Sequence, residues 1–365
     1  MSHIADLISH HCPNGVEQKL ISDVATLERG KYISKKTAIP GEIPVIAGGR
    51  GPAYWHNEPN RTGELLTVAG SGAYAGFVQY WDSPIFLSDA FSITTNPQLK
   101  TRFLYHWLKN KQDFLHSLKK GSGVAHVYPK DIAKLKIPVP PLEVQAEIVR
   151  ILDSFTNLEA NLQTELEARS KQYEYCKNKL FSFSNEIPLL PLSDIADIGT
   201  GSSNTNEAID AGKYPFFVRS QEPLRKNDYD FDETAIITAG DGVGVGKVYH
   251  YVDGKYALHQ RAYRIHINTP SVCPKFFFHY MKSAFLPYIE KTMYHGSVPS
   301  IRRPMLNRFP VPVPPLAEQE RIVAILDKFD ALVNDLSSGL PAEIEARRKQ
   351  YEYYRDQLLT FTPAK

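Results

Sequence analysis

Short polar clusters in this chain contain the side-chain types that bind nucleic acid. His259-Gln260-Arg261 and Ser88-Asp89 sit at matching places, just before Tyr263 and Phe91. Gln and Arg form paired hydrogen bonds with the edges of adenine and guanine. The polar face of a strand explains any one of these residues equally well, so they are candidate base contacts and no more.

Two glycine-rich stretches lie at corresponding places, Gly70 to Gly76 and Gly240 to Gly246. A dinucleotide-binding loop follows a strand and opens a helix. Here strand-like sequence follows each stretch, which favours a glycine hairpin over a cofactor cradle. Glycine has no side chain, so such a hairpin can still approach a DNA backbone closely.

Cations flank each loop of a second matched pair. Gly121 to His126 follows Lys119-Lys120, and Gly296 to Ser300 precedes Arg302-Arg303. These cations are plausible phosphate contacts, although ordinary exposed surface is an equal alternative. The candidate DNA-binding residues are Lys31, Lys35, Arg50, Gly70, Gly72, Lys119, Lys120, Ser122, His126, Arg219, Gln221, Arg225, Gly242, Lys247, Gln260, Arg261, Ser297, Arg302 and Arg303.

Signatures of catalysis are missing from the sequence. The twelve histidines show no metal-ligand spacing, and no catalytic triad can be nominated. There is no Asn/Asp-Pro-Pro-aromatic methyltransferase motif, no loop for S-adenosylmethionine, no P-loop and no acidic metal cluster. We therefore expect no catalytic residue, no metal site and no cofactor bound by this chain.

Composition limits the location of the chain. It has 365 residues, which predicts two or three domains. No apolar run reaches the roughly 18 residues of a membrane span, and the N-terminus has no signal pattern. The three cysteines form no metal spacing and no even framework. We expect a cytoplasmic protein.

Positive charge is concentrated in the first of two β-like segments. The first lobe (residues 19–136) carries 16 Lys and Arg against 9 Asp and Glu. The second lobe (residues 188–312) carries 14 against 12. A basic lobe is the electrostatic footprint of nucleic-acid binding. Ordinary solvated surface remains a strong alternative for the second lobe.

The sequence contains the same frame twice. Ile137-Pro-Val-Pro-Pro-Leu142 returns as Val311-Pro-Val-Pro-Pro-Leu316, at an offset of 174 residues. Glu167-Ala-Arg to Lys-Gln-Tyr-Glu-Tyr175 returns at 345–353. A duplicated frame around divergent lobes predicts one architecture that presents two different surfaces.

Each frame continues into a helical tract with a heptad seam, which needs a partner helix along its length. The first tract reads as one helix over residues 142–183. The second carries four extra residues, among them Gly339 and Pro341, which predict a kink or a break with Pro341 in the first turn of a restarted helix. The residues expected in helix pairing and subunit docking are Ile148, Ile151, Phe155, Leu158, Leu162, Tyr173, Ile322, Ile325, Phe329, Leu332, Leu336 and Tyr351.

These patterns predict an α+β fold with a pseudo-two-fold internal repeat. Two mixed, mostly β domains are separated by two long helical regions. The seams permit antiparallel or parallel pairing, and a two-fold repeat favours the antiparallel coiled coil. The predicted segments are residues 1–141 and 186–315 for the lobes, and residues 142–185 and 316–365 for the helices.

The duplicated frame resembles the specificity subunit of type I restriction–modification systems. The resemblance covers nearly the whole chain, and the opening Cys12-Pro-Asn-Gly-Val16 followed by Ser22-Asp23-Val24 is also similar. It implies two target-recognition domains, each reading one half of an asymmetric bipartite DNA site. The Gly339/Pro341 insertion departs from equal helix lengths.

The resemblance also implies partners. The helices would dock two modification subunits that methylate adenine with S-adenosylmethionine, and restriction subunits would add ATP- and Mg-dependent translocation and cleavage. This chain would supply specificity and bind double-stranded DNA. The alternative is a coiled-coil scaffold whose lobes bind protein or glycan.

Overall fold

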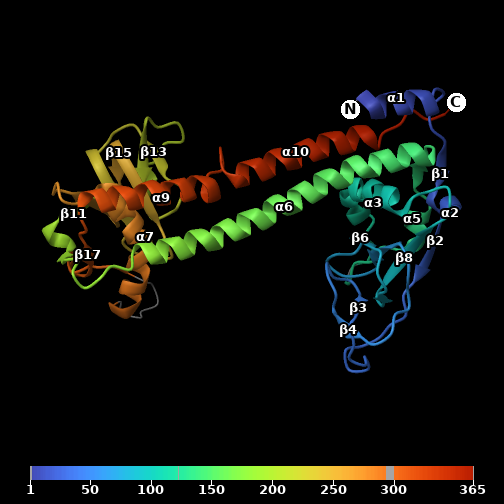
Figure 1. The fold of residues 1–365 in the computed structure, drawn as a ribbon, viewed down its shortest axis with the longest axis horizontal. Helices are drawn as coiled ribbons and strands as arrows, with labels where there is room; N and C mark the ends of the chain where they lie inside the picture. Colours follow the sequence, from blue (N-terminus) through green and yellow to red (C-terminus); the bar gives the residue numbers. More distant parts are fainter. Residues whose placement is uncertain (1, 122, 293–299, 365) are drawn as a thin grey trace. The chain divides into compact units, whose positions relative to one another are not determined.

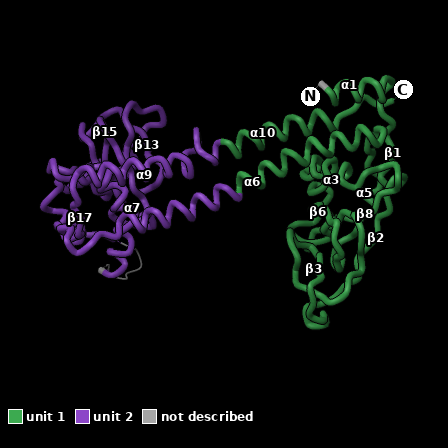
Figure 2. Tube along the Cα trace, in the orientation of Figure 1, with its two compact units in different colours: residues 1–163, 343–365 green, residues 164–342 purple. Residues whose placement is uncertain are grey.

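The computed structural model describes residues 2–121, 123–292 and 300–364. The chain forms two compact units, shown in different colours in Figure 2. Unit 1 comprises residues 1–163 and 343–365, and unit 2 comprises residues 164–342. The predicted segments put the helices in domains of their own. Here the helices are divided between the units, because each lobe shares its core with the helix segments that pack on it.

Unit 1 is built from two ends of the sequence (Figure 1). Its helices are α1 (Ser2–His11), α2 (Ile21–Val24), α3 (Thr101–Asn110), α4 (Gln112–Ser117), α5 (Pro129–Ala133), the first part of α6 (Leu142–Leu180) and most of α10 (Leu340–Leu358). Its strands are β1 (Gln18–Leu20), β2 (Ala25–Arg29), β3 (Ile43–Ile46), β4 (Tyr54–His56), β5 (Leu65–Ala69), β6 (Val78–Trp81), β7 (Phe86–Leu87), β8 (Ala90–Thr95) and β9 (Lys136–Pro138).

The first lobe has a four-stranded antiparallel sheet in the order β2-β8-β5-β6 and a smaller sheet β4-β3-β7. Helix α3 lies against the first part of α6 (Figure 1), and both contribute to one apolar core with β5 and β8. The Pro-rich stretch forms β9, which pairs only with β1. A two-stranded edge is where proline is tolerated in a sheet.

Unit 2 has the remaining elements. Its helices are the second part of α6, α7 (Pro274–Thr292), α8 (Arg303–Asn307) and α9 (Leu316–Asn334), with short 3-10 turns at Leu192–Asp194 and Thr205–Glu207. Its strands are β10 (Leu189–Pro191), β11 (Ala196–Thr200), β12 (Tyr214–Phe217), β13 (Leu224–Lys226), β14 (Phe231–Ala239), β15 (Tyr249–Leu258), β16 (Ala262–Ile267) and β17 (Pro310–Pro312).

The second lobe repeats the plan of the first with longer strands. Its six-stranded sheet has the order β11-β16-β14-β15-β12-β13. The pairing β11-β16-β14-β15 matches β2-β8-β5-β6, and β12 lies parallel to β15 as β3 lies parallel to β7. Helix α7 packs its apolar face on this sheet as α3 does in unit 1. The mixed, mostly β lobes are confirmed.

In unit 1 the paired helices run antiparallel. Phe155 on α6 stacks on Tyr354 of α10 with ring centroids 5.5 Å apart, and it also contacts Tyr351 at 6.4 Å. One turn further along α6, Glu159 accepts a hydrogen bond of 2.8 Å from Arg348, which lies earlier in α10. As the residue number rises along α6, from Phe155 to Glu159, the residue number of its partner on α10 falls, from Tyr354 to Arg348.

In unit 2 the helices exchange roles. Phe329 on α9, which corresponds to Phe155 in the repeat, stacks on Tyr173 of α6 at 6.0 Å. Tyr173 corresponds to Tyr351. Each unit therefore pairs the first half of one helical tract with the second half of the other. The expected pseudo-two-fold repeat is present in the contacts of each unit.

The predicted seam needs two corrections. Leu152 and Leu326 are fully buried although the heptad omitted them, because Val144, Ile148 and Leu152 form a second stripe that faces the lobe core. Leu336 is 82% exposed and lies between α9 and α10, so it is not a pairing residue. The insertion breaks the helix, and Pro341 occupies the first turn of α10 as expected.

The other predicted pairing residues differ in burial. Ile148 and Ile322 are fully buried and Tyr173 is 6% exposed. Leu158 and Leu332 are 38% and 37% exposed, so they stand at the margin of their helix pairs. Partly buried positions are Ile151, Phe155, Leu162, Ile325, Phe329 and Tyr351.

A buried glutamine fastens each lobe to its helix. The Gln145 amide donates to the carbonyl oxygens of Gln98 (2.9 Å) and Pro140 (2.7 Å), and its oxygen accepts from the backbone N–H of Lys100 (2.8 Å). These bonds tie the start of α6 to the start of α3 and to the Pro-rich strand. Because Gln145 is fully buried, its polar atoms depend on these partners.

Gln319 repeats this arrangement in unit 2. It donates to Ser271 and Pro314, both at 2.8 Å, and accepts from the Cys273 N–H at 2.8 Å. The side chain is again fully buried. The same three hydrogen bonds from a buried glutamine therefore attach each of the two lobes to its helix, although the lobe sequences differ.

A buried histidine on each lobe helix forms a second tie. His106 Nε2 donates to Asp153 on α6 at 2.7 Å, and His279 Nε2 donates to Asp327 on α9 at 2.8 Å. Burial lowers the pKa of both histidines, against the raising effect of the aspartates. Among the described residues, His106 Nδ1 has no hydrogen-bond partner, so a proton there would be buried and unpaired.

Acid should therefore destabilise the protein. A histidine whose folded-state pKa lies below its unfolded value takes up protons on unfolding, so stability falls as the pH drops below about 6.5. Thermal unfolding of the chain between pH 7.5 and 5.5 should show a falling midpoint. The slope should be smaller in the His106→Gln, His279→Gln double variant, and an unchanged slope would assign the acid sensitivity to other groups.

Candidate nucleic-acid interface

In unit 1 four segments meet at one corner of the sheet. β2 ends there, β8 begins there, and the glycine hairpin leaves β5 there. The loop at 120–127 lies against the hairpin, because Gly72 donates to Ala125 O (2.9 Å) and Val127 donates to Gly70 O (3.0 Å). This corner collects loops that the sequence places far apart.

Positive backbone φ angles explain the glycines of the hairpins. Gly72 has φ +80° and Gly76 has +88°, and their counterparts Gly242 and Gly246 have +81° and +68°. Residues other than glycine rarely adopt positive φ angles. Each hairpin joins two antiparallel strands, β5 to β6 and β14 to β15. The predicted glycine hairpins are confirmed.

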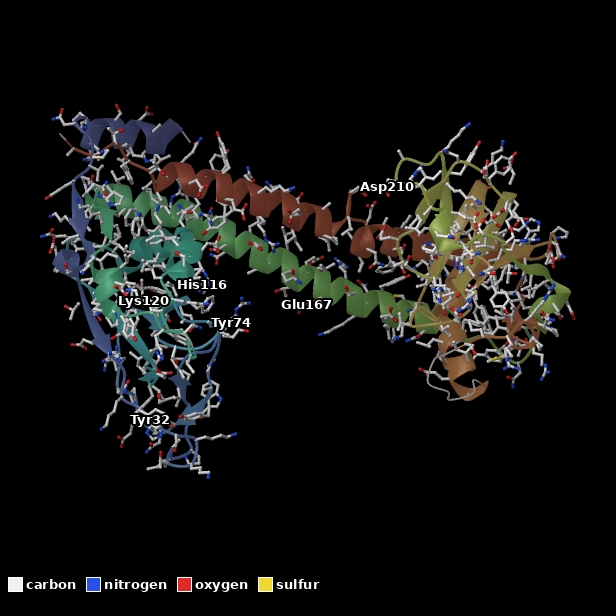
Figure 3. All side chains as sticks on the ribbon, turned by 180° about the vertical axis from the view of Figure 1, so that it is seen from behind. Tyr32, Tyr74, His116, Lys120, Glu167 and Asp210 are labelled. Carbon is white, nitrogen blue, oxygen red and sulfur yellow. The ribbon has the colours of Figure 1, made fainter. Side chains whose placement is uncertain are left out.

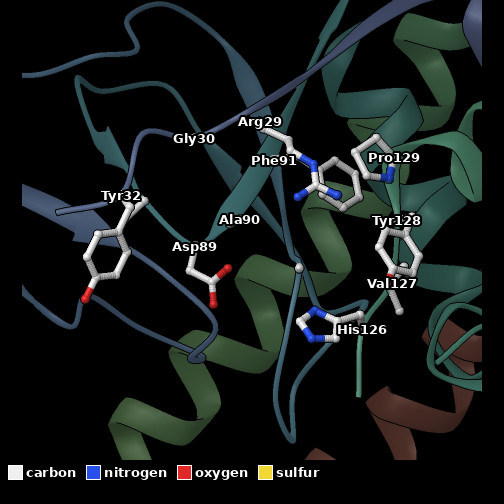
Figure 4. Close-up of a pocket in the computed structure, with 12 residues that line it drawn as sticks. Arg29, Gly30, Tyr32, Asp89, Ala90, Phe91, His126, Val127, Tyr128 and Pro129 are labelled. Carbon is white, nitrogen blue, oxygen red and sulfur yellow. The ribbon is translucent and has the colours of Figure 1, made fainter. Parts of the chain in front are cut away.

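The corner of unit 1 contains a cavity of about 240 Å³. The carboxylate of Asp89 and the ring of His126 point into the same space, with Tyr32 and Tyr128 beside them (Figure 4). Ser71 donates a hydrogen bond to Asp89 and so fixes the carboxylate. Tyr32, on the loop that follows β2 (Figure 3), is 79% exposed. The cavity offers an oriented acceptor and aromatic faces.

The matched corner of unit 2 carries a different set of charges. Ile301 donates to Gly240 O at 2.8 Å, as Val127 does to Gly70. Asp241 takes the place of Ser71 and accepts from Arg219 Nη1 (2.7 Å) and Arg261 Nη1 (3.1 Å). Partial burial would raise the pKa of Asp241, but the two guanidinium groups outweigh this effect and lower it. The carboxylate stays ionised between two arginines.

Of the residues predicted in the first lobe, several gather at this corner. Gly70, Gly72 and His126 form it, while the cations nearby are partly engaged. Lys119 donates to Ala73 O at 2.8 Å, and Lys120 (Figure 3) is paired with Asp131 at 2.9 Å. Three more of the predicted residues are exposed cations: Lys31, Lys35 and Arg50.

The predicted residues of the second lobe fall into three sets: those at the corner, one that braces its own loop, and those that are simply exposed. Arg219, Gly242 and Arg261 lie at the corner, and Gln260 donates to Asn204 beside it. Arg225 instead donates to the carbonyls of Gly212 and Lys213, at 2.6 and 3.1 Å, and braces its own loop. The exposed remainder are Gln221, Lys247, Arg302 and Arg303.

Two predicted residues, Ser122 and Ser297, lie outside the described residues. Asp89 was noted in the sequence as part of the Ser88-Asp89 cluster, although it was left out of the list of candidate residues, and Asp241 was missed altogether. A search for cations and amides passes over a carboxylate. The sequence signal for Asp241 was its position directly after Gly240, the first glycine of the hairpin. Its contact with the candidate Arg219 is visible only in the structure.

The helices present a second repeated surface. Exposed apolar side chains recur at equivalent places: Leu142 and Leu316 (both 46% exposed), Leu158 and Leu332, and Tyr175 and Tyr353 (67% and 59%). Unit 1 holds one member of each pair and unit 2 holds the other. Their recurrence at equivalent positions makes these side chains candidates for contact with a partner that binds both copies of the frame.

Neither a metal site nor a membrane helix is found in the part of the chain that the structure describes. No group of three or more His, Cys, Asp or Glu residues within it could hold a metal ion. No helix in these residues is both long and apolar enough to cross a bilayer.

A family model described as the type I restriction modification DNA specificity domain matches the chain twice, over residues 13–168 and 189–346. Each match contains nearly all of one lobe and the Pro-rich start of its repeated frame. The matches together cover most of the chain, and they divide it as the repeat does.

Curated relatives match over long stretches. A putative type I restriction enzyme specificity subunit of Haemophilus influenzae is 29% identical over 379 residues, covering 95% of this chain and 96% of that protein. The EcoR124I/EcoR124II specificity subunit of Escherichia coli is 34% identical over 292 residues, covering 71% of this chain and 70% of that protein.

Solved structures share the fold. The type I restriction–modification S subunit from M. genitalium superposes with a TM-score of 0.65 at 18% identity, covering 94% of each chain. A chain from a study of complex assembly in the type I restriction–modification system has a TM-score of 0.55 at 17% identity, covering 95% of this chain and 98% of that one.

Proposed function

Because this chain belongs to the type I restriction–modification DNA specificity family, we propose that each of its lobes reads one half of an asymmetric bipartite DNA target. The protein is a non-catalytic specificity subunit. The observation that carries the proposal is the contrast between a repeated helical frame and two divergent lobes. Lobes with different corner chemistry should read different half-sites, so the target should lack symmetry.

The repeated helices are proposed to dock two modification subunits, one on each copy of the frame. Support comes from the recurring exposed side chains, Leu142, Leu158 and Tyr353 in unit 1 and Leu316, Leu332 and Tyr175 in unit 2. One partner surface can recognise both sets, because the residue types agree. Restriction subunits would join the same assembly.

Cofactors are proposed to reside on the partners. S-adenosylmethionine would bind the modification subunits, and ATP and Mg²⁺ would bind the restriction subunits. The three free cysteines, Cys12, Cys176 and Cys273, suit the reducing cytoplasm that we propose as the location. A coiled-coil scaffold for protein or glycan ligands, the alternative from the sequence, is not supported by the family or by the relatives.

Exchange of the first lobe should test the proposal. Replacing residues 19–136 with the equivalent lobe of another family member should change one half-site and leave the other as it was, because the second lobe is untouched. The methylated sites of cells that carry the hybrid with its modification subunit would be mapped. A change in both half-sites would refute separate reading by the two lobes, and an exchange of the second lobe provides the reciprocal control.

A further inference from the structure

The two matched corners differ in the charges they present. The residue two places after β3 is Gly48, and the residue two places after the matched strand β12 is Arg219. The hairpin residue beside them is Ser71 in the first lobe and Asp241 in the second. At these two positions the second lobe therefore has an arginine together with the carboxylate that binds it, and the first lobe has neither.

A second arginine reaches the same carboxylate from another loop. Arg261 precedes β16 and bonds Asp241 Oδ2, while Arg219 bonds Oδ1. The Asp241 side chain is 22% exposed, whereas Arg219 and Arg261 are 41% and 60% exposed. Each of these bonds engages one terminal nitrogen, Nη1, of a guanidinium group whose side chain is exposed. The carboxylate thus holds two donor groups in fixed orientations at the surface.

This arrangement suits a base better than a phosphate. A carboxylate between two arginines weakens their field and repels a phosphate, so it works against a backbone contact. It does favour a base contact, because an oriented guanidinium meets two acceptors on one edge without losing rotamer freedom at binding. In the major groove guanine presents such a pair, O6 and N7, whereas adenine presents one acceptor and one donor.

We propose that Arg261 and Arg219, positioned by Asp241, form a fork in the second lobe that selects guanine in the half-site read by that lobe. This inference rests on the proposed function. Asp241 is a positioning residue, because it acts through the two arginines. The first lobe has Asp89 and His126 at its corner and lacks the fork, so its half-site is read by other chemistry.

The experiment uses the chain assembled with its modification subunit. Lobe exchange first identifies which half-site belongs to the second lobe. Methylation rates are then measured on duplexes that carry guanine or adenine at each guanine position of that half-site. The complex should prefer guanine at one position by about ten-fold to a hundred-fold, the range of a bidentate pair. In the Arg261→Lys variant this preference should fall to a few-fold, although the charge is kept.

Two further variants separate the fork from a phosphate contact. Asp241→Asn removes a negative charge. If the arginines contacted phosphate, this variant would bind DNA more tightly and its base preference would be unchanged. The fork predicts a loss of preference at the same position instead. Lys255→Gln removes a cation at the opposite end of the β14–β15 pair and should leave the preference intact. Thermal unfolding of each variant establishes that it is folded.

Each outcome decides between the possibilities. A half-site of the second lobe without any G·C pair would overturn the fork, as would a uniform loss of methylation on all duplexes after Arg261→Lys. Both results would leave recognition by the two lobes in place. If the wild-type complex showed no sequence preference at all, the proposed function itself would fail.

Discussion

Replacing Gln145 and Gln319 with Leu is expected to give the largest loss of stability among single-site changes of the frame. Each substitution keeps the volume but removes the side chain that bonds one buried and two partly buried backbone groups. An unsatisfied buried group costs about 1–3 kcal/mol, so each variant should lose roughly 4 kcal/mol in the free energy of unfolding. At about 2–4 °C per kcal/mol, the unfolding midpoint should fall by around 10 °C.

Calorimetry of Gln145→Leu, Gln319→Leu and the double variant would measure this. Gln163→Leu is a matched control, since Gln163 lies exposed on α6. Its midpoint should stay near that of the wild type. Equal midpoints for Gln145→Leu and Gln163→Leu would mean that the three hydrogen bonds do not fasten the lobe.

The second large effect concerns the helix pairs. Changing Phe155 and Phe329 together to Asp should abolish assembly with the modification subunits. Phe155 packs on two tyrosines of α10 and Phe329 on Tyr173 of α6, so each aspartate would sit against aromatic rings. In unit 2 the new carboxylate at position 329 would also lie next to Asp330, and the two negative charges would repel each other. A fully buried unpaired carboxylate costs several kcal/mol, and at these two partly buried positions the cost is a fraction of that at each site.

Co-expression followed by size-exclusion chromatography would show whether the complex forms. The Phe155→Leu, Phe329→Leu variant preserves apolar packing and should still assemble. Thermal unfolding of the aspartate variant should show a lower midpoint than that of the leucine variant. Normal assembly of the aspartate variant would show that these positions do not hold the helix pairs.

The helices were predictable because their information is local or repeated. The spacing of Phe155 and Phe329 predicted two residues of the paired faces, and Pro341 predicted the restart of α10. Leu152 was missed because a heptad describes one contact face, whereas this helix also contacts its lobe. The burial of a second stripe depends on where the lobe lies, which periodicity does not encode.

The site was predictable by residue type but not by arrangement. Arg261 was nominated because arginine reads bases, Arg219 stood in the same list of candidates, and both lie at the corner of the second lobe. Their convergence on Asp241 joins three loops that are separated by many residues. Sequence gives no distance between such loops. For the same reason Arg225 could not be told from a DNA contact, although it braces its own backbone.

Unit 1 draws its core from both ends of the sequence, which has a consequence for the order of folding. Leu358 and Leu359 fill the same core as Ile4 and Ile148, and Val16 donates to Thr362 O at 2.8 Å. Unit 2 is contiguous, so all of its residues are synthesised before residues 343–365. At about 5–20 residues per second, the first lobe waits roughly 10–40 s for its last helix. The lobe that is synthesised first is expected to mature last, with its apolar helix face uncovered in the meantime.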